Sequence, residues 1–171
     1  MTDPLAIKII IFDVDGVLTD GSLLIDDHGV ESKRFHVRDG LAIKAATMMG
    51  LKIASISSRT SGATTLRLTE LGVDPLLQGI RDKAAGLKTV CQQAQLLPDH
   101  AAYVGDDLMD LPAMLRCGYP IAVADAVDEV ITEARFVTRA PGGHGAAREA
   151  IEHILKSQGR WEKLVDRYAG R

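Results

Sequence analysis

The sequence predicts an α/β fold: a doubly wound, mostly parallel, Rossmann-like sheet from which a β-hairpin projects. Short β-branched runs alternate with segments of helical periodicity, as in βαβ units around a parallel sheet. The first run, Ile7–Phe12, is almost continuously apolar, which is typical of a central strand that helices cover on both faces. A length of 171 residues fits one core, so we expect a single domain over residues 1–171.

At least five strands are predicted, with helices between them. The strands span residues 7–12, 51–56, 101–104, 121–124 and 136–138. The helices span about residues 39–49, 61–71, 83–95, 108–116, 127–134 and 145–157. Glycines just after three of these helices, at positions 50, 72 and 118, fit the usual place of glycine at a helix C-terminus.

Two segments fall outside this alternation. Residues 22–25 and 30–37 flank the turn-rich Asp26-Asp27-His28-Gly29, so we expect a β-hairpin over about residues 22–37, close to the end of the first strand. The C-terminal tail, residues 160–171, follows Gly159 and carries too few apolar residues for a core of its own. It should therefore dock on another surface or fray.

Composition and charge argue against several classes of protein. A net charge of -3 gives no reason to expect nucleic-acid binding, and no run approaches the about 18 apolar residues of a membrane span. The N-terminus does not resemble a signal peptide, so we expect a soluble cytoplasmic protein. Cys91 and Cys117 lack C-x-x-C spacing, and we expect two buried, inert thiols.

Two carboxylates follow the first strand. Asp13 and Asp15 lie where ligands bind in open parallel sheets, beyond the carboxyl ends of the strands. Because side chains two apart in an extended chain leave the same face, the pair could share a cation or act as nucleophile and acid. The alternative is an Asp pair that only caps a turn.

A second acidic cluster follows a later strand. Asp106, Asp107 and Asp110 add carboxylates to the same edge of the predicted sheet. Such a cluster is unfavourable without a cation, and ligands that are all oxygen suit Mg²⁺. The alternative is that Asp106 and Asp107 cap a helix and lie in its first turn.

A phosphoryl group beside these carboxylates would need positive charge and hydrogen-bond donors. Lys83 opens a predicted helix, and Ser57, Ser58 and Arg59 follow the strand over residues 51–56, so these side chains could reach the same edge. Taken singly, each has a simpler explanation: a lysine at a helix start is usually solvated, and a serine after a strand is usually part of a turn.

The ordered set DVDGVLT, Ser57, Lys83 and GDDLMD resembles the four motifs of the haloacid dehalogenase superfamily. The resemblance covers most of the chain and implies that Asp13 attacks phosphorus, while Asp15 protonates the leaving oxygen and later activates water. Ser57 and Lys83 would hold the phosphoryl group. Passing through an aspartyl phosphate splits the hydrolysis into two easier steps.

The same resemblance implies a magnesium site. Asp106 would bind Mg²⁺ together with the Asp13 carboxylate and the Asp15 backbone carbonyl. Asp107 would support the metal directly or through its waters. Asp110 would brace the site from behind.

Within the superfamily, the chain is similar over nearly its full length to 3-deoxy-D-manno-octulosonate 8-phosphate phosphatases. The likeness rests on DVDGVLTDG, FHVRDGLAIK, QGIRDK, AYVGDDLMDLPAM, VADAVDEV and APGGHGAAREAIEHIL. It implies hydrolysis of this sugar-acid phosphate, a step in bacterial lipopolysaccharide synthesis, by a protein without a cap domain. It also implies a homotetramer in which the hairpin forms an intersubunit barrel and the tail helps to close a neighbour's active site.

The chain departs from that family at two positions, with Ser58 and Ala42 where glycine is usual. Arg59 follows the family and favours the eight-carbon substrate, because phosphatases of nine-carbon sugar acids tend to carry Glu there. We expect Arg59 to recognise the substrate carboxylate, since arginine pairs well with carboxylates.

Further substrate contacts are expected around the start of the first helix. Arg38 or Arg67 could assist Arg59. The resemblance places Asp39 and Gly40 on the substrate side, whereas physical chemistry alone marks Asp39 only as a candidate helix cap.

Two alternative functions stay open. One is a phosphatase for a related nine-carbon sugar-acid 9-phosphate. The other is a phospho-acceptor signalling domain, which also combines a doubly wound sheet with acids, a hydroxyl and a lysine. In such a domain the phosphoryl group is taken at the end of a middle strand, whereas here a second acidic cluster follows Lys83, so the motif order argues against it.

Overall fold

A computed structural model describes residues 3–171, and its centre is a six-stranded parallel sheet. The order of the strands is β5-β4-β1-β6-β7-β8, and all of the pairings are parallel. The strands are β1 (Ile9–Phe12), β4 (Lys52–Ile56), β5 (Leu76–Leu77), β6 (Ala101–Gly105), β7 (Tyr119–Ala122) and β8 (Phe136–Val137). The predicted doubly wound sheet is therefore confirmed. Strand β5 was not predicted, because two residues are too short to show a periodicity.

Strand β1 lies in the middle of the sheet. All four of its residues are buried, and it pairs with β4 on one side and with β6 on the other. Phe12 lies opposite Ser55 of β4 and Val104 of β6. Residues just beyond these positions therefore share one edge of the sheet. The continuous apolar run of β1 is explained by its place, since helices cover a central strand on both faces.

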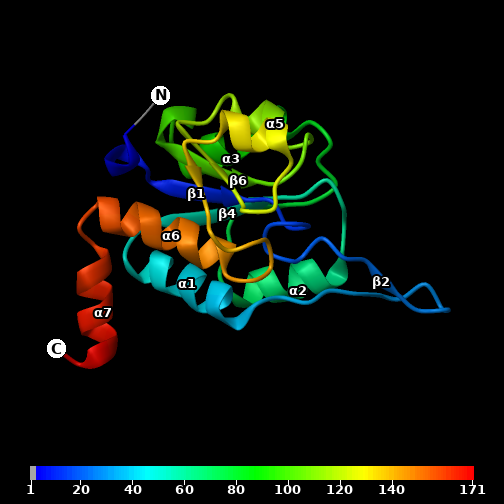
Figure 1. The fold of residues 1–171 in the computed structure, drawn as a ribbon, viewed down its shortest axis with the longest axis horizontal. Coiled ribbons are helices and arrows are strands. Elements are labelled where there is room, and N and C mark those ends of the chain that lie inside the picture. Colours follow the sequence, from blue (N-terminus) through cyan, green and yellow to red (C-terminus); the bar gives the residue numbers. More distant parts are fainter. Residues whose placement is uncertain (1–2) are drawn as a thin grey trace.

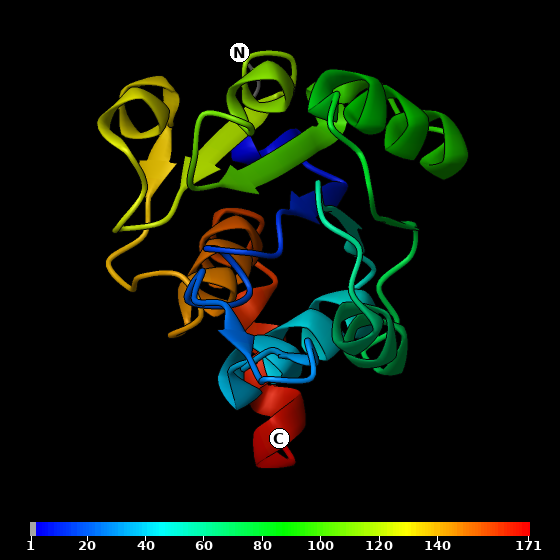
Figure 2. The ribbon, with the colours of Figure 1, turned by 90° about the vertical axis from the view of Figure 1, so that its right-hand side faces the viewer.

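Helices cover both faces of the sheet (Figure 2). One layer holds α3 (Lys83–Ala94), α4 (Leu111–Met114) and α5 (Asp128–Glu133), and the other holds α1 (Val37–Met48), α2 (Gly62–Glu70) and α6 (Ala146–Ser157). Short 3-10 helices occupy Pro4–Ala6 and Pro98–His100. Helix α4 is much shorter than the predicted 108–116, because residues 107–110 form a turn instead.

The hairpin projects from the body of the molecule just after the first strand (Figure 1). Its strands, β2 (Leu24–Ile25) and β3 (Glu31–Ser32), pair antiparallel over two residues each. The predicted second strand, residues 30–37, was too long, since the chain leaves the ladder after Ser32 and enters α1 at Val37. The hairpin leaves Leu24 and Ile25 largely exposed, at 69% and 56%.

The C-terminal tail forms helix α7 (Trp161–Ala169) and docks on α6 of its own chain. Leu164 is buried, and the guanidinium of Arg148 lies over the Trp161 ring, 5.5 Å from its centroid. An apolar stripe of so few residues is enough when another helix supplies the opposite surface.

Two further expectations concern thiols and membranes. Cys91 is buried, Cys117 is half-buried, and both are free. Burial raises the pKa of both thiols, that of Cys117 to about 12, which keeps them unreactive. Within residues 3–171, no helix has the length and apolar character needed to cross a bilayer.

Candidate active site

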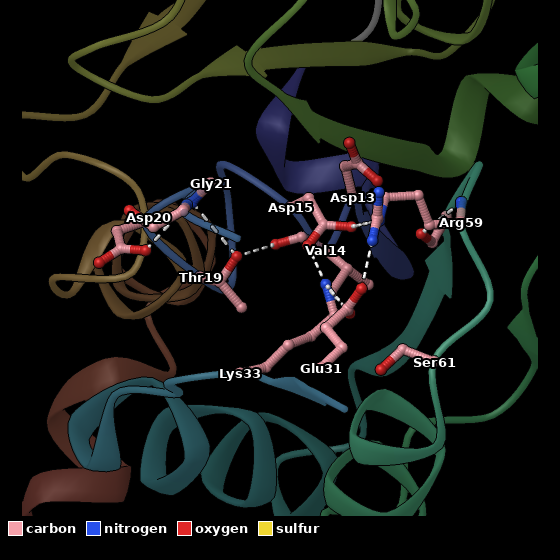
Figure 3. A network of polar contacts seen from close by, with 12 residues as sticks. Asp13, Val14, Asp15, Thr19, Asp20, Gly21, Glu31, Lys33, Arg59 and Ser61 are labelled. Atoms are coloured by element: carbon pink, nitrogen blue, oxygen red, sulfur yellow. Dashed lines mark hydrogen bonds and ion pairs between the residues drawn. The ribbon is translucent and has the colours of Figure 1, made fainter. Parts of the chain in front are cut away.

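The candidate site lies where three neighbouring strands end. Asp13 follows β1, Ser57 follows β4 and Asp106 follows β6, while Lys83 is the first residue of α3. Because the strands are parallel and adjacent, their carboxyl ends bring these residues to one edge. Figure 3 shows the part of this edge around Asp13, Asp15 and Arg59.

Asp13 is buried and paired with an equally buried lysine. The Nζ of Lys83, whose side chain is 1% exposed, lies 2.8 Å from Asp13 Oδ2 and 2.5 Å from Asp110 Oδ1. Burial raises the pKa of Asp13 to about 7, the charge of Asp110 adds to this, and Lys83 opposes it. Burial alone would lower the pKa of Lys83, but the two carboxylates raise it above its usual value, so the ammonium group stays charged.

Asp110 is fully buried and holds the loop after β6 in place. Its Oδ1 accepts hydrogen bonds from Lys83 Nζ and, at 2.8 Å, from the Tyr103 hydroxyl. Its Oδ2 accepts from the backbone N–H groups of Asp106, at 2.9 Å, and Asp107, at 3.3 Å. Both oxygens are thus already used, so Asp110 is suited to bracing the site rather than binding a cation.

Asp106 lies beside Asp13. Carboxylate oxygens of Asp13, Asp106 and Asp110 lie within 4.8 Å of one another, and Asp106 Oδ1 is buried without a hydrogen bond to any residue from 3 to 171. Burial first, then the charges of Asp110 and Asp13, raise the pKa of Asp106 to about 8. The backbone at Gly16 lies close against the Asp106 carboxylate. Only glycine fits there, because φ is +87° and a Cβ at this position would lie 2.0 Å from Asp106 Oδ2.

These donors fit Mg²⁺. The ion prefers a few carboxylate oxygens and keeps several waters. Asp13 and Asp106 offer such hard oxygens within 4.8 Å of each other, and Asp106 Oδ1 is buried with no hydrogen-bond partner within residues 3–171. Asp110 is part of the cluster, but its oxygens are taken by its own donors.

Asp107 was predicted as a metal ligand, but the structure does not bring its carboxylate into the cluster. The residue is exposed, and its Oδ1 accepts a hydrogen bond from the backbone N–H of Leu108 at 2.7 Å. The side chain therefore caps its own turn, which is the simpler of the two explanations that the sequence allowed.

Asp15 faces different partners from Asp13, because the chain turns immediately after β1. One oxygen of Asp15 pairs with Lys33 of the hairpin segment, and the other lies 3.6 Å from Arg59 Nε. Glu31 pairs with the same two cations, so the four charges form a closed ring of alternating sign (Figure 3). Neither Lys33 nor Glu31 was predicted as a site residue, although the hairpin was expected close to the site.

The segment after β4 presents two hydroxyl groups. Ser57 is buried, and its Oγ accepts a hydrogen bond from the backbone N–H of Arg59 at 3.2 Å. The buried Oγ of Ser58 has no hydrogen-bond partner in the described part of the chain. Arg59 itself is reachable from solvent, with a side chain that is 44% exposed.

Asp39 was predicted on the substrate side, but the structure uses it as a helix cap. Its two buried oxygens accept from the backbone N–H groups of Gly145, at 3.2 Å, and Arg148, at 2.7 Å, at the start of α6. A carboxylate satisfies the free N–H groups of a helix N-terminus and interacts well with its dipole. Burial nonetheless raises the pKa of Asp39.

The other predicted contacts near α1 also lie apart from the carboxylate cluster. Gly40 packs against Arg67, whose Nη2 would be 2.4 Å from a Cβ at that position, and Arg67 pairs with Glu70. Arg38 lines a cavity with His144 and Arg148. Within residues 3–171, none of Arg38, Gly40 and Arg67 has a hydrogen bond or ion pair to Asp13.

Comparisons with known proteins show which family the chain resembles. A family model for haloacid dehalogenase-like hydrolases matches residues 76–149. The 3-deoxy-D-manno-octulosonate 8-phosphate phosphatase KdsC of Escherichia coli (strain K12) is 39% identical over 157 residues, which cover 92% of this chain and 84% of the relative. The Salmonella typhi KdsC is 38% identical over 163 residues, covering 95% and 87%.

Solved structures resemble the whole fold. The Moraxella catarrhalis 3-deoxy-D-manno-octulosonate 8-phosphate phosphatase, in complex with magnesium, phosphate and KDO, superposes with a TM-score of 0.94 at 34% identity, covering 96% of this chain and 95% of that one. The cobalt-bound phosphatase from Haemophilus influenzae gives a TM-score of 0.90 at 41% identity, covering 93% and 94%. The chain thus belongs to the 3-deoxy-D-manno-octulosonate 8-phosphate phosphatase family of haloacid dehalogenase-like hydrolases.

Proposed function

We propose that this chain is a single-domain, Mg²⁺-dependent phosphatase that hydrolyses 3-deoxy-D-manno-octulosonate 8-phosphate to 3-deoxy-D-manno-octulosonate and phosphate. One observation carries the proposal: the buried Asp13 carboxylate, paired with Lys83, lies beside an Asp106 oxygen that has no hydrogen-bond partner within residues 3–171. A nucleophile, a cation and a carboxylate oxygen suited to bind a metal together suit phosphoryl transfer.

In the first step, an Asp13 oxygen attacks phosphorus. The bond from Asp13 to phosphorus forms, the bond from phosphorus to the sugar oxygen breaks, and Asp15 gives its proton to that oxygen. Lys83 offsets negative charge beside Asp13, while Ser57 supplies a hydroxyl to the phosphoryl group. A bound Mg²⁺, held by Asp13 and Asp106 with the Asp15 carbonyl, would offset the charge of the phosphoryl oxygens.

In the second step, water releases the phosphate. Asp15 takes a proton from the water, the oxygen of the water bonds to phosphorus, and the bond to Asp13 breaks, so that both carboxylates return to their starting state. The family resemblance assigns Asp15 to both steps, and in the structure its carboxylate pairs with Lys33 and lies 3.6 Å from Arg59 Nε.

Arg59 is the residue we assign to the substrate carboxylate. It is half-exposed, it stands next to Asp15, and a planar guanidinium can bind a carboxylate through two hydrogen bonds. The Moraxella catarrhalis relative was solved with KDO, the sugar acid that this reaction would release. This supports the eight-carbon substrate over a nine-carbon one.

We further propose a homotetramer whose active sites are completed by neighbouring subunits. The exposed apolar side chains of the projecting hairpin, Leu24 and Ile25, support an intersubunit contact. The phosphorylated sugar acid is multiply charged and does not cross a membrane unaided, so the enzyme should act in the cytoplasm, where we expect its substrate to be made.

The test is phosphate release in the presence of Mg²⁺. The octulosonate ester, a nine-carbon analogue and the carboxylate-free ester p-nitrophenyl phosphate would be compared for the wild type and Asp13→Asn. We expect the octulosonate ester to have the highest kcat/KM and Asp13→Asn to be inactive. Preference for the nine-carbon ester would move the substrate assignment, and a stable phosphoprotein without turnover would favour the signalling function.

A further inference from the structure

The guanidinium assigned to the substrate carboxylate is already held by a carboxylate of the protein. Glu31 Oε2 pairs with Arg59 Nη2, while Asp15 Oδ2 lies 3.6 Å from Arg59 Nε. One whole edge of the guanidinium is therefore occupied by internal acids (Figure 3). This is the edge geometry that a bound carboxylate would use.

We propose that Glu31 occupies the place of the substrate carboxylate on Arg59, and that the substrate displaces it on binding. The inference rests on the proposed function, specifically on Arg59 as the carboxylate partner. Glu31 then acts as an internal competitor that sets how tightly sugar-acid ligands bind, and it thereby eases release of the acidic product.

Three features make the exchange feasible. Arg59 is 44% exposed, so a ligand can approach it from solvent. The other oxygen of Glu31 lies 3.3 Å from Lys33 Nζ, so Glu31 keeps a cationic partner after leaving Arg59. Lys33 is only 2% exposed and is also held by Asp15, so it remains in place during the exchange.

In this exchange the Glu31 side chain would turn away from Arg59 while its backbone stays in the hairpin ladder. Glu31 lies at one of just two paired positions of the ladder, opposite Ile25. Both cations hold the pKa of Glu31 below its usual value, against the opposing effect of burial, so the residue competes as a carboxylate at neutral pH. A neutral side chain of the same shape should compete far less well.

The decisive variant is Glu31→Gln, which keeps the shape and removes the charge. KM would be measured for the octulosonate ester and for p-nitrophenyl phosphate. The KM ratio, that of the octulosonate ester divided by that of p-nitrophenyl phosphate, would then be compared with the wild-type ratio. The ratio cancels any general disturbance that reaches Asp15 through Lys33. We expect this ratio to fall about 1.5- to 5-fold, the range for loss of one partly exposed ion pair.

Two controls separate competition from loosening of the hairpin. Asp20→Asn removes a different ion pair to the hairpin segment, with Arg34, and should leave the KM ratio near its wild-type value. In an Arg59→Gln background, Glu31→Gln should no longer change the ratio, because the group for which it competes is gone. Calorimetric titration of free octulosonate with Mg²⁺ present should show tighter binding to Glu31→Gln without requiring turnover.

The outcomes are distinct. A higher KM ratio in Glu31→Gln would mean that Glu31 orients Arg59 for the substrate, and an unchanged ratio with unchanged octulosonate binding would mean that it does not compete; either overturns the inference and leaves the phosphatase intact. If the wild type hydrolyses neither ester and does not bind octulosonate, the proposed function itself fails, and the inference fails with it.

Discussion

Replacing Lys83 by methionine tests the electrostatic design of the site. The two side chains have similar volume, so no large cavity forms, but Asp13 and Asp110 both lose their shared cation. Breaking a buried ion pair from one side costs about 3–5 kcal/mol. Asp110 keeps its hydroxyl donor and two backbone donors, whereas Asp13 can escape its charge by taking up a proton. We therefore expect a loss near the lower end of that range.

The loss should grow with pH. Lys83 lowers the pKa of Asp13, so in the variant this pKa rises above its wild-type value of about 7, far above the value of 3.8 in an unfolded chain. Between about pH 4 and about pH 7, the folded state of either protein holds a proton on Asp13 that the unfolded state releases, so both lose stability alike. Above about pH 7 only the folded variant keeps this proton, so the destabilisation grows there. The destabilisation should be smaller at about pH 5.5 than at about pH 8.5.

Urea unfolding followed by circular dichroism measures this effect at both pH values, without Mg²⁺ and at fixed protein concentration. Lys88→Met is the matched control, because Lys88 lies on the exposed side of the same helix and should change the free energy of unfolding by no more than about 0.5 kcal/mol. A loss of under about 1 kcal/mol for Lys83→Met, or a loss that does not depend on pH, would refute the reasoning.

Three further results are expected. Tyr103→Phe removes a donor to buried Asp110 and should lower the free energy of unfolding in urea by about 1.5–3 kcal/mol. A smaller loss would contradict a hydrogen bond to a charged carboxylate. Mg²⁺ should raise the melting temperature more at about pH 8.5 than at about pH 6, because Asp13 and Asp106, with pKa values of about 7 and about 8, must lose protons to bind it; an equal rise at both would exclude these ligands. Asp106→Asn should raise the Mg²⁺ concentration needed for half-maximal phosphate release at least about 10-fold and Asp107→Asn by much less, and equal effects would return Asp107 to the metal site.

Much of the fold followed from local patterns. The apolar run of β1 could be recognised because a strand buried on both faces needs apolar side chains at successive positions. The first and last residues of the short elements could not be predicted in this way. Strand β5 has two residues and α4 has four, and their ends depend on neighbouring strands and on the Asp107–Asp110 turn rather than on a repeat within the segment.

Charged side chains show where sequence reasoning ends. The family resemblance assigns Asp39 and Asp107 to the site. In the structure, however, Asp39 accepts hydrogen bonds from two backbone N–H groups at the start of α6, and Asp107 accepts one from the next residue in the chain. A short acid can satisfy either a ligand or a helix end, and only the surrounding backbone decides which.

The motifs alone were enough to predict phosphoryl transfer and the edge of the sheet where it would occur. Asp13, Asp106, Ser57 and Lys83 each adjoin a strand end or a helix start, and parallel strands necessarily bring such positions together. The pairing of the charged side chains, in contrast, could be seen only in the folded chain. The ring of Asp15, Lys33, Glu31 and Arg59 joins the end of β1, the hairpin and the loop after β4, and no pattern within one segment encodes contacts between side chains so far apart in the chain.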